Sequence, residues 1–336
     1  MKSLFKKHII KISNFNKHEI QKIIELSLYL KKNRNNQQEI QYLKNKKIAL
    51  IFEQESTRTR CAFEIAAIEQ GAYSSYFGPG NMHLGYKESI IDTAKILSKM
   101  YDGIQYRGND HNVIKILSKY ASVPVWNGLT NKYHPTQLIA DLLTMIEFSR
   151  NKNISEIICS YLGDASNNIG NSLVELAGIM GFQLNLIAPK KYWPDQKILN
   201  KYIKSNNIIC TENINQGIYQ SDFIYTDVWV SMGETEDAWK KKIELLRKYQ
   251  VNKKIIQIAQ NPKVKILHCL PALHDKNTKI GKKISNLYQF NDGIEITNEI
   301  FDKYNRIIFQ QAENRLHTIK AILISTLTNI EKLKIY

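Results

Sequence analysis

Two successive runs of alternating strand-like and helix-like segments place the strongest constraint on how this chain can fold. In the first run, a short apolar stretch rich in β-branched residues predicts a strand at 47–52, and further strands are predicted at 73–77, 104–106 and 123–126,. The helix-like patterns of that run cover 61–71, 88–100, 112–120 and 135–148. After residue 153 the pattern restarts, with strands near 156–162, 183–188, 207–210, 222–226 and 264–268 and helices near 169–180, 195–204, 236–248 and 315–329.

This alternation predicts an α/β protein with two Rossmann-like domains, each built on a mainly parallel sheet and joined by helices. The expected bounds are 1–150 for the first domain and 151–314 for the second, while 315–336 forms a C-terminal helix that packs back on the first domain. Ligands of parallel sheets bind beyond the carboxyl ends of the strands. Polar residues that directly follow the predicted strands are therefore the candidate site.

The most informative of these stretches is Ser-Thr-Arg-Thr-Arg at 56–60, which lies where the strand 47–52 gives way to a helix. Ser56 or Thr57 can cap that helix, and the free N–H groups of its first turn then point at whatever binds there. Arg58 and Arg60 add forked positive charge that suits phosphate or carboxylate. A helix cap followed by two surface arginines is the simpler alternative.

Other polar stretches follow later strands, at Arg107, 134–137, 163–172, 227–233 and 268–271. The glycine- and asparagine-rich stretch 163–172 lacks the GxGxxG pattern of dinucleotide sites, and the chain has no GxxxxGK[ST] motif,. We therefore expect no nucleotide cofactor. A lone histidine before a helix, such as His134, is most often a cap or a surface group, but here it closes the first series of strands and helices.

Composition limits the remaining classes of protein. Hydrophobic residues make up 43% of the chain, and no apolar run is long enough to span a bilayer,. The charged N-terminal segment 1–8 lacks an apolar signal core, which predicts a cytoplasmic protein,. The four cysteines are widely spaced and form no metal-binding pattern, so reduced thiols and no metal site are expected,.

The net charge of +16 raises the possibility of nucleic-acid binding,. The lysines are spread along the whole chain and no nucleic-acid-binding motif is present, so we expect neither a nucleic-acid partner nor a membrane partner. Only eight of the 47 basic residues are arginines, and four of them, Arg58, Arg60, Arg107 and Arg315, lie in stretches that carry site-like chemistry. Arginine at these positions indicates a need for bidentate contacts.

Residues 78–87 form a loop with three glycines and one proline, and it carries His83 and Lys87. A simple connection between two elements is one interpretation of this loop. A mobile flap that brings His83 to a ligand is the other.

Taken together, the motifs resemble those of the aspartate/ornithine carbamoyltransferase family. They are Ser-Thr-Arg-Thr-Arg at 56–60, His-Pro-Thr-Gln at 134–137, Asp-Val-Trp-Val-Ser-Met-Gly at 227–233, His-Cys-Leu-Pro at 268–271 and Gln-Ala-Glu-Asn-Arg at 311–315. They follow the family's order over nearly the whole chain, and the Asp-x-x-x-Ser-Met segment is typical of its ornithine branch. The chain departs from the pattern at His83, where that branch commonly has Gln, at Met82, and at Gln310.

The resemblance implies that the first domain binds carbamoyl phosphate and the second binds L-ornithine, in a homotrimer whose active sites are shared between subunits. The residues implied to contact carbamoyl phosphate are Ser56, Thr57, Arg58, Thr59, His83, Arg107, His134, Gln137, Cys269, Leu270 and Arg315. Those implied to bind ornithine are Asn168, Asp227, Ser231 and Met232. Arg107, His134, Cys269 and Arg315 are implied to be catalytic.

The reaction implied is transfer of the carbamoyl group to the δ-amine of L-ornithine, which gives L-citrulline and phosphate in arginine biosynthesis. Hydroxyls, N–H groups and arginines suit the negative charge that grows on the departing phosphate. Cys269 is a candidate to contact the amine, although a small buried thiol is the alternative. No cofactor is expected. A carbamoyltransferase for another amine or amino acid, and an inactive homologue that acts as a binding partner, remain open.

Overall fold

The computed structural model describes residues 4–82, 84–202, 207–230, 235–290 and 292–329, and the chain divides into two compact units. Unit 1 comprises Met1–Leu143 and Glu313–Tyr336, and unit 2 comprises Thr144–Ala312. Two helices, α5 (Pro135–Phe148) and α12 (Asn298–Leu327), run across the division. The bounds 1–150, 151–314 and 315–336 therefore stay a prediction about domains rather than a description of these units.

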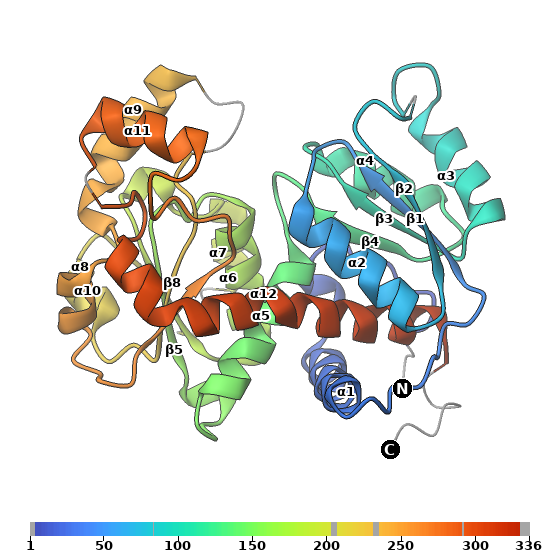
Figure 1. Ribbon diagram of the computed structural model, residues 1–336, viewed down its shortest axis with the longest axis horizontal. Helices are drawn as coiled ribbons and strands as arrows, with labels where there is room; N and C mark the ends of the chain where they lie inside the picture. The colour runs from blue at the N-terminus through green and yellow to red at the C-terminus, as the bar shows by residue number, and fades with distance from the viewer. Residues whose placement is uncertain (1–3, 83, 203–206, 231–234, 291, 330–336) are drawn as a thin grey trace. The chain divides into compact units, whose positions relative to one another are not determined.

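Unit 1 is built on a parallel sheet with the order β2-β1-β3-β4 (Figure 1). Its strands are β1 (Lys47–Phe52), β2 (Tyr73–Phe77), β3 (Gly103–Arg107) and β4 (Val125–Leu129). Its helices, besides the ends of α5 and α12, are α1 (Lys17–Asn35), α2 (Thr57–Glu69), α3 (Ile90–Met100) and α4 (His111–Tyr120).

Both faces of this sheet are covered, which explains why the central strand β1 is a nearly continuous apolar run in the sequence,. Helices α3 and α4 pack on the face that carries Ile104 and Tyr106. Trp126 points to the opposite face, where its ring lies 6.5 Å from that of Phe63 in α2 and its Nε1 donates a 3.0 Å hydrogen bond to Thr326 in α12. Both α2 and α12 therefore pack on that face of the sheet.

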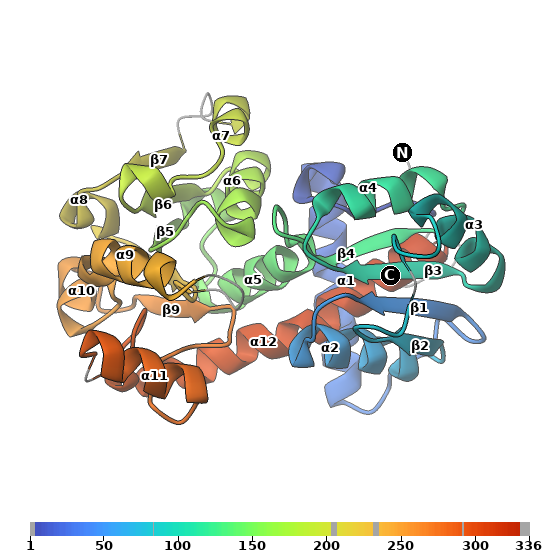
Figure 2. The ribbon, with the colours of Figure 1, turned by 90° about the horizontal axis from the view of Figure 1, so that it is seen from above.

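Unit 2 contains a second parallel sheet, in the order β7-β6-β5-β8-β9 (Figure 2). Its strands are β5 (Ile158–Leu162), β6 (Gln183–Ile187), β7 (Ile208–Thr211), β8 (Phe223–Thr226) and β9 (Lys265–His268). Its helices are α6 (Asn168–Met180), α7 (Gln196–Tyr202), α8 (Ile214–Ile218), α9 (Glu236–Leu246), α10 (Lys253–Ile258) and α11 (Lys279–Tyr288).

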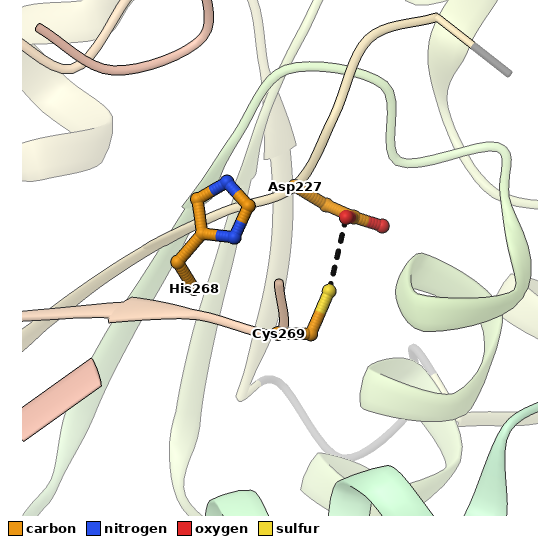
Figure 3. Close-up of side chains that lie close together, drawn as sticks. All are labelled: Asp227, His268 and Cys269. Carbon is orange, nitrogen blue, oxygen red and sulfur yellow. Dashed lines mark hydrogen bonds between the residues drawn. The ribbon is translucent and has the colours of Figure 1, made fainter. Parts of the chain in front are cut away.

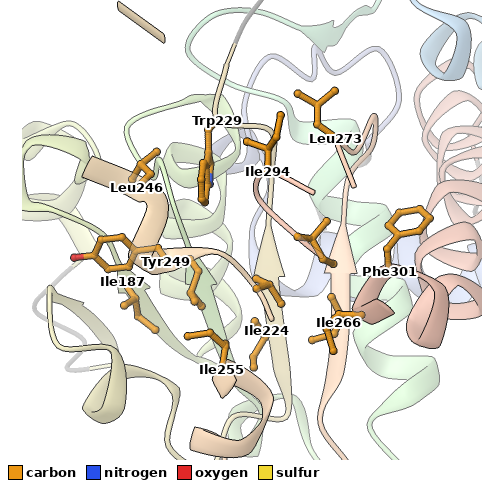
Figure 4. Close-up of a cluster of buried hydrophobic side chains, with 14 of the residues drawn as sticks. Ile187, Ile224, Trp229, Leu246, Tyr249, Ile255, Ile266, Leu273, Ile294 and Phe301 are labelled. Atoms are coloured by element: carbon orange, nitrogen blue, oxygen red, sulfur yellow. The ribbon is translucent and has the colours of Figure 1, made fainter. Parts of the chain in front are cut away.

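One hydrophobic cluster of unit 2 lies on a single face of this sheet (Figure 4). Ile187, Ile224 and Ile266 come from three strands and are fully buried against Leu246 of α9 and Ile255 of α10. Burial of each such side chain contributes roughly 1.5–3 kcal/mol. The prediction of an α/β protein with two mainly parallel sheets is confirmed.

Some predicted boundaries are wrong. The helix expected at 61–71 begins at Thr57 and ends at Glu69, because Ser56 caps it by accepting a 3.3 Å hydrogen bond from the Thr59 backbone N–H. The helix expected at 315–329 is the second half of the 30-residue α12. Within the described part of the chain, no helix has the length and apolarity that crossing a membrane requires.

Candidate active site

The first group of predicted residues lies at the carboxyl edge of the sheet in unit 1. Ser56 is the N-cap of α2, so Thr57, Arg58 and Thr59 form its first turn, where backbone N–H groups have no partner within the helix,. Arg107 ends β3, and its Cα pairs with that of Phe52 at the end of β1. Parallel pairing of β1 with β3 thus brings the arginine beside the start of α2.

Two arginines converge on one hydroxyl in this group. Arg107 Nη1 donates to Thr59 Oγ1 over 3.2 Å, and Arg315 Nη2 of α12 donates to the same oxygen over 2.6 Å. Thr59 is fully buried and Arg315 is 2% exposed. Burial and then the charge of Arg58 lower the pKa of Arg107 to about 10, which leaves it charged at neutral pH. Concentrated positive charge with little water around it is an environment that favours an anion.

His134 and Gln137 are also buried in unit 1, at the start of α5. Burial first, and then the charges of Arg315, Arg107 and Arg58, hold the pKa of His134 well below its usual value. The imidazole is therefore neutral at pH 7 and can still donate one N–H. Gln137 Nε2 donates a 2.8 Å hydrogen bond to Asp141 Oδ1, which orients the Gln137 amide.

Arg60 does not join the other arginines. Its Nε donates to Glu64 Oε1 over 2.9 Å, one turn along α2, and its guanidinium carbon lies 3.7 Å from the centre of the Tyr76 ring. An ion pair and a cation–π contact thus occupy the Arg60 side chain. The prediction that Arg60 contributes to the anion site is wrong for the described structure, whereas Arg58, Arg107 and Arg315 share one electrostatic environment around His134.

The second group lies at the carboxyl edge of the sheet in unit 2 (Figure 3). Asp227 follows β8, and Cys269 follows β9. The Cys269 Sγ donates to Asp227 Oδ1 over 2.9 Å, and the Val228 backbone N–H donates to the same oxygen over 2.8 Å. Burial raises the pKa of Asp227, although His268 and these two hydrogen bonds act against that rise. An ammonium group is the partner that such a buried carboxylate favours.

His268 supports Cys269 from the other side. Its Nε2 lies 3.1 Å from Glu295 Oε1, and its Nδ1 accepts a 2.9 Å hydrogen bond from the Leu270 backbone N–H. Because Nδ1 accepts, Nε2 must carry the proton that is donated to Glu295. Leu270 adopts a left-handed φ of 59°, which is costly for a residue with a side chain and is typical of functional segments,.

Asp227, His268 and Cys269 hold ligand-type atoms within 4.8 Å of one another, so their ability to hold a metal must be considered. The lone pair of His268 Nδ1 is occupied by the Leu270 N–H, and Nε2 carries a proton. This leaves one carboxylate and one thiol, fewer than the three or four protein ligands of a zinc site. The residues therefore do not fit a bound metal in this arrangement.

The remaining predicted residues have mixed outcomes. Asn168 is the first residue of α6, but the cap of that helix is Asn167, whose Nδ2 donates to Asp227 Oδ2 over 3.3 Å. Asn167 and Glu295 are site residues that the sequence did not reveal. A helix-cap pattern at 167–170 could have revealed the first. His83, Ser231 and Met232 lie outside the described residues.

Comparison with known proteins agrees with this geometry. Residues 7–147 match the carbamoyl-P binding domain of the aspartate/ornithine carbamoyltransferases, and residues 155–326 match their Asp/Orn binding domain. The chain is 59% identical over 332 residues to the ornithine carbamoyltransferase of Buchnera aphidicola from Schizaphis graminum, an alignment that covers 97% of this chain and 98% of that relative. It is 52% identical to the enzyme of the same name from Blochmanniella floridana, with 97% and 96% covered.

Solved structures show the same relationship. The ornithine carbamoyltransferase from Pyrococcus furiosus has a TM-score of 0.86 and 32% identity, with 97% of this chain and 99% of that chain covered. The anabolic enzyme from Campylobacter jejuni has a TM-score of 0.83 and 32% identity, with 94% and 97% covered. Family models that together match most of the sequence, and relatives above 50% identity over almost its full length, establish that this chain belongs to the aspartate/ornithine carbamoyltransferase family.

Proposed function

We propose that this chain is an ornithine carbamoyltransferase, which transfers the carbamoyl group of carbamoyl phosphate to the δ-amine of L-ornithine and releases L-citrulline and phosphate. The observation that carries the proposal is the convergence of Arg107 and Arg315 on the Thr59 hydroxyl at the start of α2. Names of relatives that align along the whole chain support the same activity, and arginine biosynthesis is its usual setting.

Carbamoyl phosphate is a dianion whose phosphate gains negative charge as the bond to the carbonyl carbon breaks. The positive end of the α2 dipole at its first turn, with the guanidiniums around Thr59, suits that charge because these groups are already oriented,. The neutral His134 imidazole is a donor for the carbonyl oxygen as it becomes an oxyanion. A neutral donor serves well here, since nearby arginines already supply the positive charge.

Ornithine brings an α-ammonium, an α-carboxylate and a δ-amine. The buried Asp227 carboxylate is the group in unit 2 that suits an ammonium. The δ-amine should titrate near a lysine, at about 10.4, so roughly one molecule in a thousand is the reactive free amine at neutral pH. We assign Cys269 to the δ-amine, because its Sγ lies 2.9 Å from Asp227 Oδ1 and sulfur can accept a hydrogen bond from an amine N–H, which leaves the nitrogen lone pair for the attack,.

The full assignment follows the family motifs. Residues proposed to bind carbamoyl phosphate are Ser56, Thr57, Arg58, Thr59, His83, Arg107, His134, Gln137, Cys269, Leu270 and Arg315. Residues proposed to bind ornithine are Asn168, Asp227, Ser231 and Met232. A cytoplasmic location and a homotrimer with shared active sites complete the proposal. Exposed apolar side chains on unit 1, Ile65 and Ile68 of α2 and Tyr73 of the edge strand β2, support an oligomer,.

The test is a direct assay for the carbamoylated product, which is citrulline when L-ornithine is the acceptor, with the purified chain, carbamoyl phosphate and a panel of acceptors. L-Ornithine should be used far better than L-lysine, putrescine or L-aspartate, since a dicarboxylate acceptor would meet the Asp227 carboxylate. Preferred use of another acceptor would mean a different carbamoyltransferase. No product from any acceptor would favour an inactive homologue.

A further inference from the structure

An ion pair in unit 2 links two segments that flank the proposed acceptor site. Lys242 Nζ of α9 lies 2.7 Å from Asp164 Oδ2, and the two side chains are only 12% and 7% exposed. By contrast, Lys283 and Glu236 form a surface pair with side chains that are 49% and 60% exposed. Burying two charges carries a large desolvation cost unless their geometry is well satisfied. We therefore look for a structural or functional role of the Lys242–Asp164 pair.

Asp164 organises the loop 163–167 that follows β5. Its Oδ1 accepts hydrogen bonds from the Ser166 backbone N–H over 3.0 Å and from Ser166 Oγ over 2.5 Å. Its backbone carbonyl accepts a 3.0 Å hydrogen bond from the Tyr161 hydroxyl. Gly163 precedes it with a φ of 113°, a conformation that only glycine adopts without strain,. Oδ1 of Asp164 therefore holds the loop in one shape, and Oδ2 connects the loop to α9 through Lys242.

The same loop leads directly to the Asp227 carboxylate. Asn167, three residues after Asp164, caps α6 by accepting a 2.9 Å hydrogen bond from the Gly170 backbone N–H. Its Nδ2 donates to Asp227 Oδ2 and to the Tyr161 hydroxyl, each over 3.3 Å. Asp164 and Asn167 thus share Tyr161 as a common partner. A change in the position of Asp164 would be passed to Asn167, and from there to the carboxylate.

We propose that Asp164 and Lys242 are positioning residues for the acceptor amino acid. The ion pair holds α9, the helix that follows Asp227 along the chain, against the loop that orients Asn167. In this way it sets the place of the Asp227 carboxylate without itself touching ornithine or the reacting atoms. The inference rests on the proposed function, because it names a specificity device for the ornithine side of that reaction.

The test compares steady-state kinetics of the full-length enzyme and four variants of the pair. They are Lys242→Met, Lys242→Arg, Asp164→Asn and the double variant with Lys242→Met and Asp164→Asn. Each single loss of charge should raise KM for ornithine about tenfold and leave KM for carbamoyl phosphate within about twofold. Lys242→Arg keeps the charge and should stay within about threefold of the wild type.

The double variant separates positioning from folding. It contains no unpaired buried charge, so its thermal stability should return close to that of the wild type, while KM for ornithine stays raised. Lys152→Met is the matched control, because Lys152 pairs with Asp222 over 2.6 Å at the amino edge of the same sheet. Its ornithine KM should not change.

Three results would overturn the inference. The first is an equal increase in KM for ornithine and for carbamoyl phosphate in the single variants. The second is an increase in KM for ornithine in Lys152→Met as large as that in Lys242→Met. The third is a double variant with the wild-type KM for ornithine. A wild-type chain that makes no citrulline would instead remove the proposed function, and the inference with it. The two failures are therefore distinguishable in one series of assays.

Discussion

The Thr59 hydroxyl accepts hydrogen bonds from two arginines, so this one oxygen helps to position both guanidiniums. Thr59→Val keeps the shape of the side chain but leaves two buried N–H donors without an acceptor. An unsatisfied buried donor costs about 1–3 kcal/mol, so kcat/KM for carbamoyl phosphate should fall by about ten- to a hundredfold. Thr59→Ser keeps the oxygen and is the control. Equal activity of both variants would show that the arginines are held by other contacts.

Burial raises the pKa of Asp227, and this direction determines how the binding of an ammonium group should depend on pH. A raised pKa means that the carboxylate takes up its proton at a higher pH than an ordinary aspartate, which titrates near 3.9. Binding of an ammonium group should therefore weaken as the pH falls, starting above that ordinary range. L-Norvaline, which matches ornithine but lacks the δ-amine, reports this binding without the titration of the nucleophile.

The measurement is the inhibition constant of L-norvaline against pH for the wild type and for Asp227→Asn. The inhibition constant of the wild type should rise as the pH falls. That of Asp227→Asn should be higher than the wild-type value at neutral pH and should not depend on pH. The KM for carbamoyl phosphate, corrected for the titration of the phosphate, serves as the control. Parallel pH profiles for the two proteins would assign Asp227 a structural role.

Motif residues were predictable because the parallel sheets bring strand ends together. Arg107 and Ser56 are far apart in the sequence, but Arg107 ends β3 and Ser56 comes shortly after β1, and the pairing of β1 with β3 makes them neighbours. Glu295 was not predictable, since it acts on His268 through a contact that no local pattern encodes. For Arg60 the sequence left an anion-binding role and a surface role open, because it does not show that Glu64 and Tyr76 flank this side chain.

At the scale of elements, the strands were predicted more reliably than the helices. Strands buried on both faces are short apolar runs, as at 47–52, which a sequence shows directly,. The first half of α12 mixes charged residues with only a narrow apolar stripe, so its start at Asn298 was missed. Helix α11 was missed for the same reason, because only a few of its residues, such as Ile284, are buried.

Helix α12 carries Arg315, and a buried ion pair anchors it in unit 1. Lys320 is fully buried and pairs with Glu39 over 2.6 Å and with Glu69, which also pairs with Arg34. Burial raises the pKa of Glu69, but hydrogen bonds and charges of Lys320 and Arg34 outweigh it and lower the pKa. The stabilisation is therefore present above the pKa of Glu69 in the unfolded chain and is lost as the pH falls through the lowered value.

Lys320→Met should reduce the free energy of unfolding by about 3–5 kcal/mol, because it leaves two carboxylates without their buried partner. Urea unfolding at neutral pH measures this change. Lys283→Met removes an exposed pair with Glu236 and should cost about 0–1 kcal/mol,. If the free energy of unfolding falls by the same small amount in both variants, the ion pairs of Lys320 do not anchor α12.

At the scale of the whole molecule, the proposed homotrimer makes unit 1 the place to look for contacts between copies of the chain. Ile65 and Ile68 of α2 are 39% and 59% exposed, and Tyr73 at the start of the neighbouring edge strand β2 is 67% exposed. Apolar side chains clustered on adjacent elements are typical of interaction surfaces. The edge strand also leaves backbone groups available for a partner.

Ile68→Asp introduces a charge into that surface and should convert the trimer to monomers, as judged by sedimentation equilibrium or light scattering. If active sites are shared between subunits, citrulline formation should fall in proportion to the loss of trimer and recover at high protein concentration, where mass action restores it. Leu287→Asp is the control, since Leu287 is 52% exposed on α11 of unit 2. A monomeric variant with full activity would contradict shared sites, and an intact trimer would exclude α2 from the interface.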